Sequence, residues 1–564
     1  MSVLDGLDPE QRVAAEQLLG PLCVLAGAGT GKTRTITHRI AHGVEEGIYN
    51  PGNLLALTFT TKAAGELRHR LRALGAPGIP VRTFHAEALA QLSHFWPRYV
   101  GGGQPRLLEG KSRFIGEAAE RVGIRLGPAG IRDVATELEW RKTSELSLEA
   151  YPAAAGSRPM PRGLDVDAVA SVLATYEEMK DERRRLDFED VLLVAAGMLE
   201  TESAARERVR ERYRFFVVDE YQDVSPLQHR LLGLWLGGRH DVCVVGDANQ
   251  TIYTFAGASS RYLLGFENDH PGANVVRLER SYRSAPAILG VANGLMRGRP
   301  GALELRAAAS GRGEVAVPAV HPDDAAEAAA VASAVAAEIA AGTPAAQIGV
   351  LYRVNEQATA LEEALAAAGV MTRRLGGTRF FDLPAVRQVV SVLAVHAQRA
   401  PRDPVRPTVA DAARDAGWTV DAGHSRLPRA EWVALDALVA LAESAPDEVD
   451  MERFAAELSE RAGNDIEPPV RAVVLSTLHA AKGLEWDSVH LVGVAEGLLP
   501  VVHARGAAAI DEERRLLYVG ITRARRRLAL SWARRGPRGQ ERRPSRFLEE
   551  LRTSIPGAAT RSSR

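Results

Sequence analysis

Short apolar runs followed by polar or glycine-rich residues recur in the first part of the chain. They cover residues 22–26, 54–59, 215–218, 242–245 and 275–278. Continuous apolar runs of this length are typical of strands buried on both faces of a parallel sheet, whose strand ends form the functional edge. The pattern therefore predicts a parallel α/β core. A helix is expected to begin after Asp8, where Pro9 and Gln11 complete the pattern of a capped N-terminus.

A second series of apolar runs occupies the later part of the chain, at 348–352, 473–477, 489–494 and 528–532. Two long segments without this pattern, 86–185 and 384–469, interrupt the two series. No repeat of fixed period is present. We therefore predict an α/β protein with two parallel-sheet cores, each carrying a mainly helical insert.

Composition and charge bound the class of protein. The 564 residues are 46% hydrophobic and 25% charged, as in ordinary globular proteins, and the length suggests three or four domains at about 150 residues each. The net charge of -1 means that a nucleic-acid surface would have to be a local track of Arg and Lys.

The cysteines, the N-terminus and the alanine-rich stretch all bear on the compartment in which the protein is expected. Cys23 and Cys243 lie inside apolar runs without a CxxC pair, so we expect reduced, structural thiols and no zinc. The acidic N-terminus has no signal-peptide core, and the alanine-rich stretch 325–341, interrupted by Glu327 and Glu338, is expected to be a surface helix. These features predict a cytoplasmic protein with no membrane partner.

A phosphate-binding loop follows the first apolar run. The sequence AGAGTGKT occupies residues 26–33 and is followed by a helical pattern, which is the context that such a loop requires. Small residues let backbone N–H groups surround a β-phosphate, Lys32 reaches the β and γ oxygens, and Thr33 offers its hydroxyl to Mg²⁺. The alternative interpretation of this segment is a glycine-rich turn that binds no ligand.

Paired carboxylates follow the run at 215–218. Asp219 is expected to hold Mg²⁺ and Glu220 to act as the base that activates water. Such acids are often only solvated strand ends, but an upstream phosphate loop on another strand favours the catalytic interpretation. The two motifs together predict a nucleoside triphosphatase that uses ATP and Mg²⁺.

Seven motifs in order resemble those of the UvrD/Rep/PcrA-type superfamily 1A DNA helicases. They are AGAGTGKT (26–33), TFTTKAAGELRHR (58–70), VDEYQD (218–223), VGDANQTIYTFAGA (245–258), SYRS (281–284), TLHAAKGLEW (477–486) and YVGITRARRRL (518–528). The resemblance implies two RecA-like P-loop cores: domain 1A at 1–85 and 186–277, with insert 1B at 86–185, and domain 2A at 278–383 and 470–552, with a shortened insert 2B at 384–469. The polar residues 553–564 are expected to be a disordered tail.

The resemblance also assigns residue roles. Gln11 is similar to the adenine-reading Gln, Arg34 and Tyr282 to the pair that stacks on the base, and Gln250 to the γ-phosphate sensor. Arg283 and Arg523 resemble the arginines that the second core sends to the transition state. The nucleotide set also includes, by resemblance, the loop residues and two residues near the phosphates and ribose: Ala28, Gly29, Thr30, Gly31, Gly483 and Glu485.

The DNA track is assigned in the same way. Aromatic residues in matching motifs resemble the base-stacking set, and polar residues resemble those that contact the DNA backbone and bases. These residues are Phe59, Tyr253 and Phe255, and Thr83, His85, Asn355, Thr477 and His479. Taken alone, each has an ordinary structural interpretation.

The implied activity is ATP-dependent 3′→5′ translocation on single-stranded DNA and unwinding of 3′-tailed or forked duplexes, in DNA repair or replication restart. By resemblance the enzyme is a monomer that closes its two cores on ATP and takes one nucleotide step per ATP. DNA-repair proteins are possible partners. Two alternatives stay open: a remodeler that strips proteins from single-stranded DNA with little unwinding, and the motor subunit of a helicase-nuclease.

Three departures from the family pattern stand out. Ala256 occupies a position where relatives commonly have Arg, Thr61 one where Asn is usual, and the 2B insert is shortened. Within the family the chain most resembles the shorter, second UvrD-type group of actinobacteria. We expect it to lack that group's C-terminal HRDC and four-cysteine modules.

Overall fold

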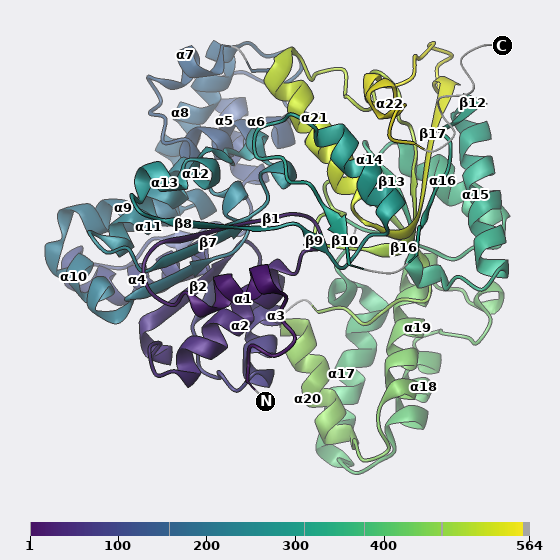
Figure 1. Ribbon diagram of the computed structural model, residues 1–564, viewed down its shortest axis with the longest axis horizontal. Helices are drawn as coiled ribbons and strands as arrows, with labels where there is room; N and C mark the ends of the chain where they lie inside the picture. The colour runs from purple at the N-terminus through teal and green to yellow at the C-terminus, as the bar shows by residue number, and fades with distance from the viewer. Residues whose placement is uncertain (1, 157, 309–310, 377, 464–465, 556–564) are drawn as a thin grey trace. The chain divides into compact units, whose positions relative to one another are not determined.

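The computed structural model describes residues 2–156, 158–308, 311–376, 378–463 and 466–555 (Figure 1). The chain forms two compact units, Met1–Glu279 and Arg280–Arg564. Each unit is built around a parallel sheet with helices on both sides, so the prediction of two parallel α/β cores is confirmed.

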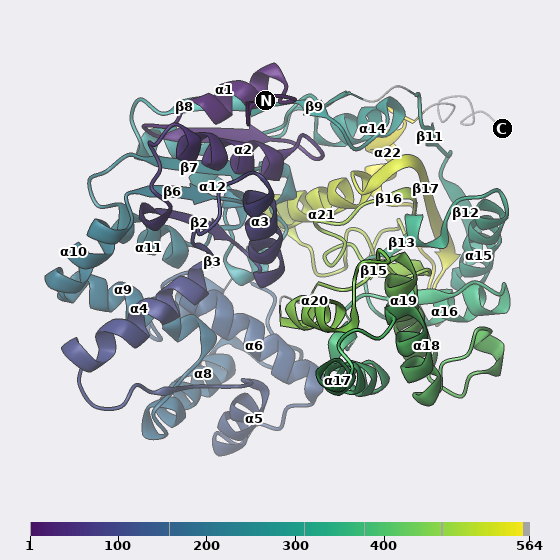
Figure 2. The same cartoon turned by 90° about the horizontal axis from the view of Figure 1, so that it is seen from below.

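The sheet of the first unit has six parallel strands in the order β3-β2-β6-β7-β1-β8 (Figures 1 and 2). They are β1 (Leu22–Ala26), β2 (Leu54–Thr58), β3 (Val81–Thr83), β6 (Phe215–Val218), β7 (Val242–Gly246) and β8 (Asn274–Leu278). Successive strand residues point to opposite faces. Val217 packs in the cluster beneath the N-terminal helices, whereas Phe216 and Val218 pack in the cluster on the other side.

Helices cover both faces of this sheet. One face packs on α1 (Pro9–Glu16), α2 (Lys32–Glu45) and α3 (Thr61–Ala73). The other packs on α4 (Phe84–Tyr99), α9 (Phe188–Thr201), α10 (Ser203–Arg212) and α11 (Pro226–Leu236), with the short α12 (Arg261–Leu264) and α13 (Phe266–Asp269) nearby. Helix α1 begins at Pro9 with both hydrogen bonds of a capping box between Asp8 and Gln11, as predicted.

The first insert is helical. It contains α5 (Ser112–Arg121), α6 (Pro128–Thr143), α7 (Tyr151–Ala155) and α8 (Val166–Glu182), which enclose an apolar cluster of their own. Where the chain enters and leaves the insert, β4 (Arg106–Leu107) pairs in parallel with β5 (Arg185–Leu186). Helices α6 and α9 contact each other, which joins the insert to the core of the same unit.

The sheet of the second unit has the order β11-β17-β16-β13-β15-β14, and β12 also pairs with β17. Its strands are β11 (Glu314–Val315), β12 (Ala319–Asp323), β13 (Ile348–Tyr352), β14 (Thr372–Arg374), β15 (Val473–Thr477), β16 (Trp486–Leu491) and β17 (Ala524–Arg535). A separate short pair joins β9 (Arg280–Ser281) to β10 (Arg306–Ala307). The helices around this core are α14 (Pro286–Met296), α15 (Asp324–Ala340), α16 (Gln357–Ala367), α21 (Gly506–Ile521) and α22 (Arg546–Leu551).

The second insert is also helical and has its own apolar cluster. Its helices are α17 (Pro384–Arg399), α18 (Val405–Asp415), α19 (Arg429–Ser444) and α20 (Met451–Gly463).

Two strand boundaries predicted from the sequence are wrong. The run at 489–494 belongs to a strand that starts earlier, at Trp486, and ends at Leu491. The run at 528–532 is the middle of the long β17, which extends in both directions because β16, β11 and β12 all pair with it. In both places backbone pairing extends the strand into polar sequence.

Three other expectations concern the thiols, the alanine-rich helix and the tail. Cys23 and Cys243 are free and buried in adjacent strands, and burial raises the pKa of Cys23 to about 12. No helix among the described residues has the length and apolar character needed to cross a bilayer. Disorder from 553 onward does not hold for Ile555, which is buried; residues 556–564 lie outside the described part of the chain.

Candidate nucleotide and DNA site

The phosphate loop lies between β1 and α2 at the carboxyl edge of the first sheet. Gly29 and Gly31 have φ values of 75° and 81°, a left-handed conformation that favours glycine. Gly31 is the N-cap of α2, so the first N–H groups of that helix have no capping side chain and are suited to bind an anion. Lys32 is the first residue of the helix, followed by Thr33.

Gln11 contacts the phosphate loop directly. Its Nε2 donates to the carbonyl of Thr30 at 2.8 Å, and its Oε1 accepts from the backbone N–H of Asp8 at 3.2 Å. A Cβ atom at Gly31 would lie 2.6 Å from this Nε2, so glycine is required for the close approach. Gln11 therefore links α1 to the loop in this structure, and contact with an adenine would exchange these bonds for bonds to the base.

Acidic residues stand at the end of β6, which is separated from β1 only by β7. Asp219 is buried and accepts the backbone N–H of Glu220 at 2.9 Å. Glu220 has a φ of 53°, an uncommon value for a non-glycine residue that is often found at functional sites. Because parallel strands end at one edge, the sheet order brings the Asp219–Glu220 pair and the phosphate loop to the same edge, as predicted.

A polar network that sequence reasoning missed supports Gln250. Asp247, at the end of β7, accepts the side-chain N–H of Gln250 at 2.8 Å, and its own backbone N–H donates to Gln222 Oε1 at 3.0 Å. The other side of the Gln222 amide donates to Glu220. Burial raises the pKa of Asp247, and the nearby charge of Lys32 opposes the rise. The predicted base and γ-phosphate sensor are thus joined through Gln222 and Asp247.

The predicted stacking residues of the first unit lie beyond this network. Tyr253 and Phe255 follow Gln250 within one short segment, and their rings are T-shaped with centroids 6.1 Å apart. The Phe255 side chain is exposed, whereas Phe59 is partly buried against the core. Thr83 ends β3 and caps α4 by accepting the N–H of Ala86.

A further aromatic residue, Phe188, was missed. It is 51% exposed at the start of α9, and its ring stacks on that of His85 at 3.9 Å. Burial, aided by Lys111, lowers the pKa of His85 to about 4, so its imidazole is neutral near pH 7. The available signal in the sequence was a Phe placed directly after Asp187, a residue type that often caps a helix.

In the second unit, Arg283 and Glu485 form an ion pair. Arg283 also donates to the carbonyl of Thr522 at 3.4 Å, and Arg525 is a second partner of Glu485. Burial acts to raise the pKa of Glu485, but the two guanidinium groups outweigh it and hold the pKa below its ordinary value. Arg523 donates to the carbonyl of Leu484 at 3.1 Å, so both predicted arginines meet the 484–485 segment.

The other predicted residues are distributed around these groups. Arg34 is exposed on α2 and donates to the carbonyl of Gly6 at 3.0 Å, and Tyr282 is 49% exposed. Gly483 adopts a φ of 87° just before Glu485. Ala28 is buried in the phosphate loop.

The predicted DNA contacts of the second unit follow two adjacent strands. β13 pairs with β15 and places Tyr352 opposite Thr477, so Asn355 and Thr477 come from neighbouring strand ends. The Asn355 side chain accepts from Arg374 at 3.2 Å. Burial, then Arg353 and Lys482, lower the pKa of His479 to about 3, which keeps this imidazole neutral near pH 7.

Comparison with known proteins matches this arrangement. The UvrD/REP helicase N-terminal domain model matches residues 7–271, and the UvrD-like helicase C-terminal domain model matches 276–419 and 435–535. The chain is 44% identical to the ATP-dependent DNA helicase UvrD2 of Mycobacterium tuberculosis, across 99% of this chain and 84% of that protein. It is 31% identical to UvrD1 of the same organism (97% and 85%) and 29% identical to DNA helicase II of Escherichia coli (97% and 88%). The chain belongs to the UvrD-like helicase family.

Proposed function

We propose that this UvrD-family, ATP-dependent DNA helicase moves 3′→5′ along single-stranded DNA and unwinds 3′-tailed or forked duplexes in DNA repair or replication restart. The observation that carries the proposal is the continuity of one sheet edge. The phosphate loop, Glu220, Asp247 and Gln250 share this edge, and Gln250 leads within three residues to the aromatic pair that begins at Tyr253. A change at the γ-phosphate therefore has a short covalent path to the DNA track.

The nucleotide chemistry follows from these groups. Lys32 and the N-terminal amides of α2 bind the phosphates, and Glu220, held by Gln222, accepts the proton of the attacking water. Arg283 and Arg523 supply positive charge to the transition state. Oxygen ligands from Thr33 and from the buried Asp219 suit Mg²⁺, which would neutralise phosphate charge when bound. Gln11, Arg34 and Tyr282 bind the base, and Glu485 the ribose.

The DNA track is proposed to run over aromatic side chains and the neutral imidazoles. The exposed Phe188 and Phe255 and the partly buried Tyr253 and Phe59 would stack on bases. Thr83, Asn355 and Thr477 would contact the backbone. Because stacking does not depend on base identity, the enzyme would bind single strands with little sequence preference.

We also propose the four-domain division 1A, 1B, 2A and 2B at the boundaries given above. Its support is that α5–α8 and α17–α20 each enclose an apolar cluster separate from those of the sheets. Helix α4, which lies largely within the 1B bounds, packs instead in the cluster of the first sheet. A monomer is the proposed active form.

The alternative of a protein-stripping remodeler uses the same motor and differs only in its output. A strand-displacement assay on 3′-tailed and 5′-tailed duplexes, with and without ATP, tests the proposal. We expect ATP-dependent displacement of the 3′-tailed duplex only, and its loss in Lys32→Ala. Displacement of a bound protein from single-stranded DNA without strand separation would favour the remodeler, and 5′-tailed preference would contradict the polarity.

A further inference from the structure

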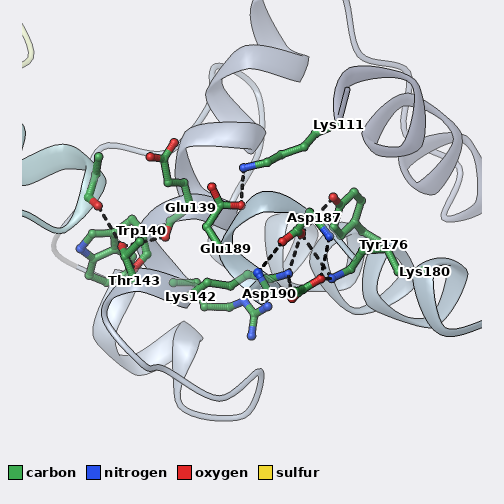
Figure 3. Close-up of polar contacts among 12 residues, drawn as sticks. Lys111, Glu139, Trp140, Lys142, Thr143, Tyr176, Lys180, Asp187, Glu189 and Asp190 are labelled. Carbon is green, nitrogen blue, oxygen red and sulfur yellow. Dashed lines mark hydrogen bonds and ion pairs between the residues drawn. The ribbon is translucent and has the colours of Figure 1, made fainter. Parts of the chain in front are cut away.

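The C-terminal end of helix α6 in the insert contacts the loop that carries Tyr253 and Phe255. Thr143 Oγ1 lies 2.8 Å from the carbonyl oxygen of Ala256, and Arg158 Nη2 lies 3.4 Å from that of Phe255 (Figure 3 shows Thr143). Two side chains of the insert therefore bind two consecutive carbonyls of one loop in the core.

The loop is shaped to fit this helix end. Gly257 has a φ of 94°, and a Cβ atom there would lie 2.4 Å from Thr143 Oγ1. The N–H groups of residues 256 and 258 donate to the carbonyl of Tyr253, and that of Gly257 donates to Thr254. The loop is thus a compact turn whose outer carbonyls are bound by the insert.

The hydroxyl of Thr143 has three nearby acceptors but one hydrogen. Besides the carbonyl of Ala256, those of Glu139 and Trp140 in the same helix lie at 2.8 and 3.3 Å. Donation to Glu139 would serve only the helix, whereas donation to Ala256 would link the helix to the loop. These two roles have different consequences, which an experiment can separate.

The residue next to Thr143 fixes the helix end. Lys142 is buried, and its Nζ lies 2.6 Å from Asp187 and 2.6 Å from Asp190. These two carboxylates form the capping box of α9, whose first residue is Phe188 (Figure 3). One buried junction therefore holds both the helix end that contacts the Tyr253–Phe255 loop and the helix that begins with the exposed Phe188.

Arg158 is held firmly as well. Its guanidinium forms two hydrogen bonds with Glu137 Oε1, at 3.2 and 2.8 Å, and lies 3.9 Å above the ring of Trp140. Both partners belong to α6. The guanidinium that contacts the loop therefore comes from the insert.

We propose that Thr143 and Arg158 are positioning residues for DNA binding: by binding the carbonyls of Ala256 and Phe255, they set where the Tyr253 and Phe255 rings stand. DNA as the ligand rests on the proposed function. Contact with the loop does not, and it can be measured without DNA.

The test uses the full chain with Thr143→Val, which keeps the shape and removes the hydroxyl. Thr143→Ser keeps the hydroxyl. Thr136→Val is the matched control, because Thr136 lies in the same helix and its exposed hydroxyl donates only to Arg132, at 3.1 Å. The first readout is hydrogen exchange of the amides of residues 256–258 without ligand. The second is the concentration of an oligothymidylate that gives half-maximal stimulation of ATP hydrolysis.

We expect Thr143→Val to speed exchange in the loop and to raise the half-maximal oligothymidylate concentration about fivefold, the effect of one lost hydrogen bond. Thr143→Ser should restore both values, and Thr136→Val should match the wild type. If Thr143→Val behaves like Thr136→Val in both readouts, the hydroxyl serves only its own helix and the proposal is wrong.

Three further outcomes are decisive. Should Thr143→Val fail to fold, Arg158→Lys replaces it, since it keeps the charge beside Glu137 and loses the bond to Phe255; unchanged readouts would again overturn the proposal. Faster loop exchange with unchanged DNA dependence would refute the role in DNA binding. Absence of any DNA stimulation in the wild type would instead sink the proposed function, while the exchange data would still report on the loop.

Discussion

Replacement of Lys142 by Met tests the buried junction between α6 and α9. The junction contains three cations and three carboxylates in contact with one another, which we call the buried charge cluster. Its members are Arg141, Lys142, Lys180, Glu177, Asp187 and Asp190. Burial acts to raise the pKa of Asp187, but Lys142 and Lys180 outweigh it and keep the carboxylate ionised. The cluster is therefore charge-balanced.

Lys142→Met removes one cation from this balance. Its Nζ lies 2.6 Å from Asp187, 2.6 Å from Asp190 and 3.0 Å from Glu177. Loss of one partner from a buried ion pair costs about 3–5 kcal/mol, because the remaining charge is unpaired. The double variant Lys142→Met/Asp190→Asn restores a balance of two cations and two carboxylates. We expect it to recover more than about 1 kcal/mol of that cost.

The assay is hydrogen exchange of amides in α6 and in the first turns of α9, which gives a local free energy of opening. Global unfolding of a chain with two units is not expected to be two-state. Arg132→Met, an exposed charge on the same helix, is the control and should change the value by less than about 0.5 kcal/mol. A cost below about 1 kcal/mol for Lys142→Met, or a double variant as destabilised as the sum of the singles, would refute this reasoning.

Three further changes test the candidate site. Gly31→Ala should weaken binding of a fluorescent ATP analogue at least about tenfold, because its Cβ would meet Gln11 and strain the loop. Gly20→Ala is the control, since Gly20 has a similar φ and open space around it, and it should not weaken binding. Equal effects of the two substitutions would assign the loss to backbone strain alone. Phe255→Ala should weaken oligothymidylate binding by the about 1–3 kcal/mol of one stacked base, and unchanged affinity in a fluorescence titration would remove Phe255 from the track. In the folded protein the pKa of His85 is about 4, below its ordinary value of about 6.5. Its contribution to the free energy of unfolding is therefore complete above pH 6.5. As the pH falls toward 4, the free energy of unfolding decreases by about 3 kcal/mol. Hydrogen exchange of amides in α4 across this range should show a smaller loss of local stability at acid pH for His85→Asn than for a variant of the exposed His94. Parallel pH profiles would contradict this prediction.

Strands such as β1, β2, β6 and β7, and the residues at their ends, could be predicted because each of these strands is a continuous apolar run. The phosphate loop and the acids after β6 follow such runs directly. The short β3 and β14 could not be predicted, because their sequences, VRT and TRR, are mainly polar. β12, which pairs with β17, could not be found in this way, because its mostly exposed sequence contains Pro322 and no continuous apolar run. The early start of β16 was missed for a related reason: Asp487 and Ser488 are polar.

The network behind the site could not be predicted because its partners are distant in the sequence. Gln222 and Asp247 are 25 residues apart, and Thr143 and Ala256 are 113 apart. No local periodicity records such contacts, since a polar side chain that satisfies a distant buried group looks like any other polar residue. Phe188 was missed because an aromatic residue alone is more often part of a core.

The proposed function depends most directly on the assignment of Arg283 as a residue that supplies positive charge during ATP hydrolysis. Arg283→Ala tests it most directly, with single-turnover ATP hydrolysis and binding of a fluorescent ATP analogue measured on the same sample in the presence of single-stranded DNA. The account predicts that hydrolysis slows by about 10³-fold or more while nucleotide affinity changes by only a few fold. Hydrolysis at the wild-type rate would show that the arginine does not reach the reacting phosphate and would contradict the account.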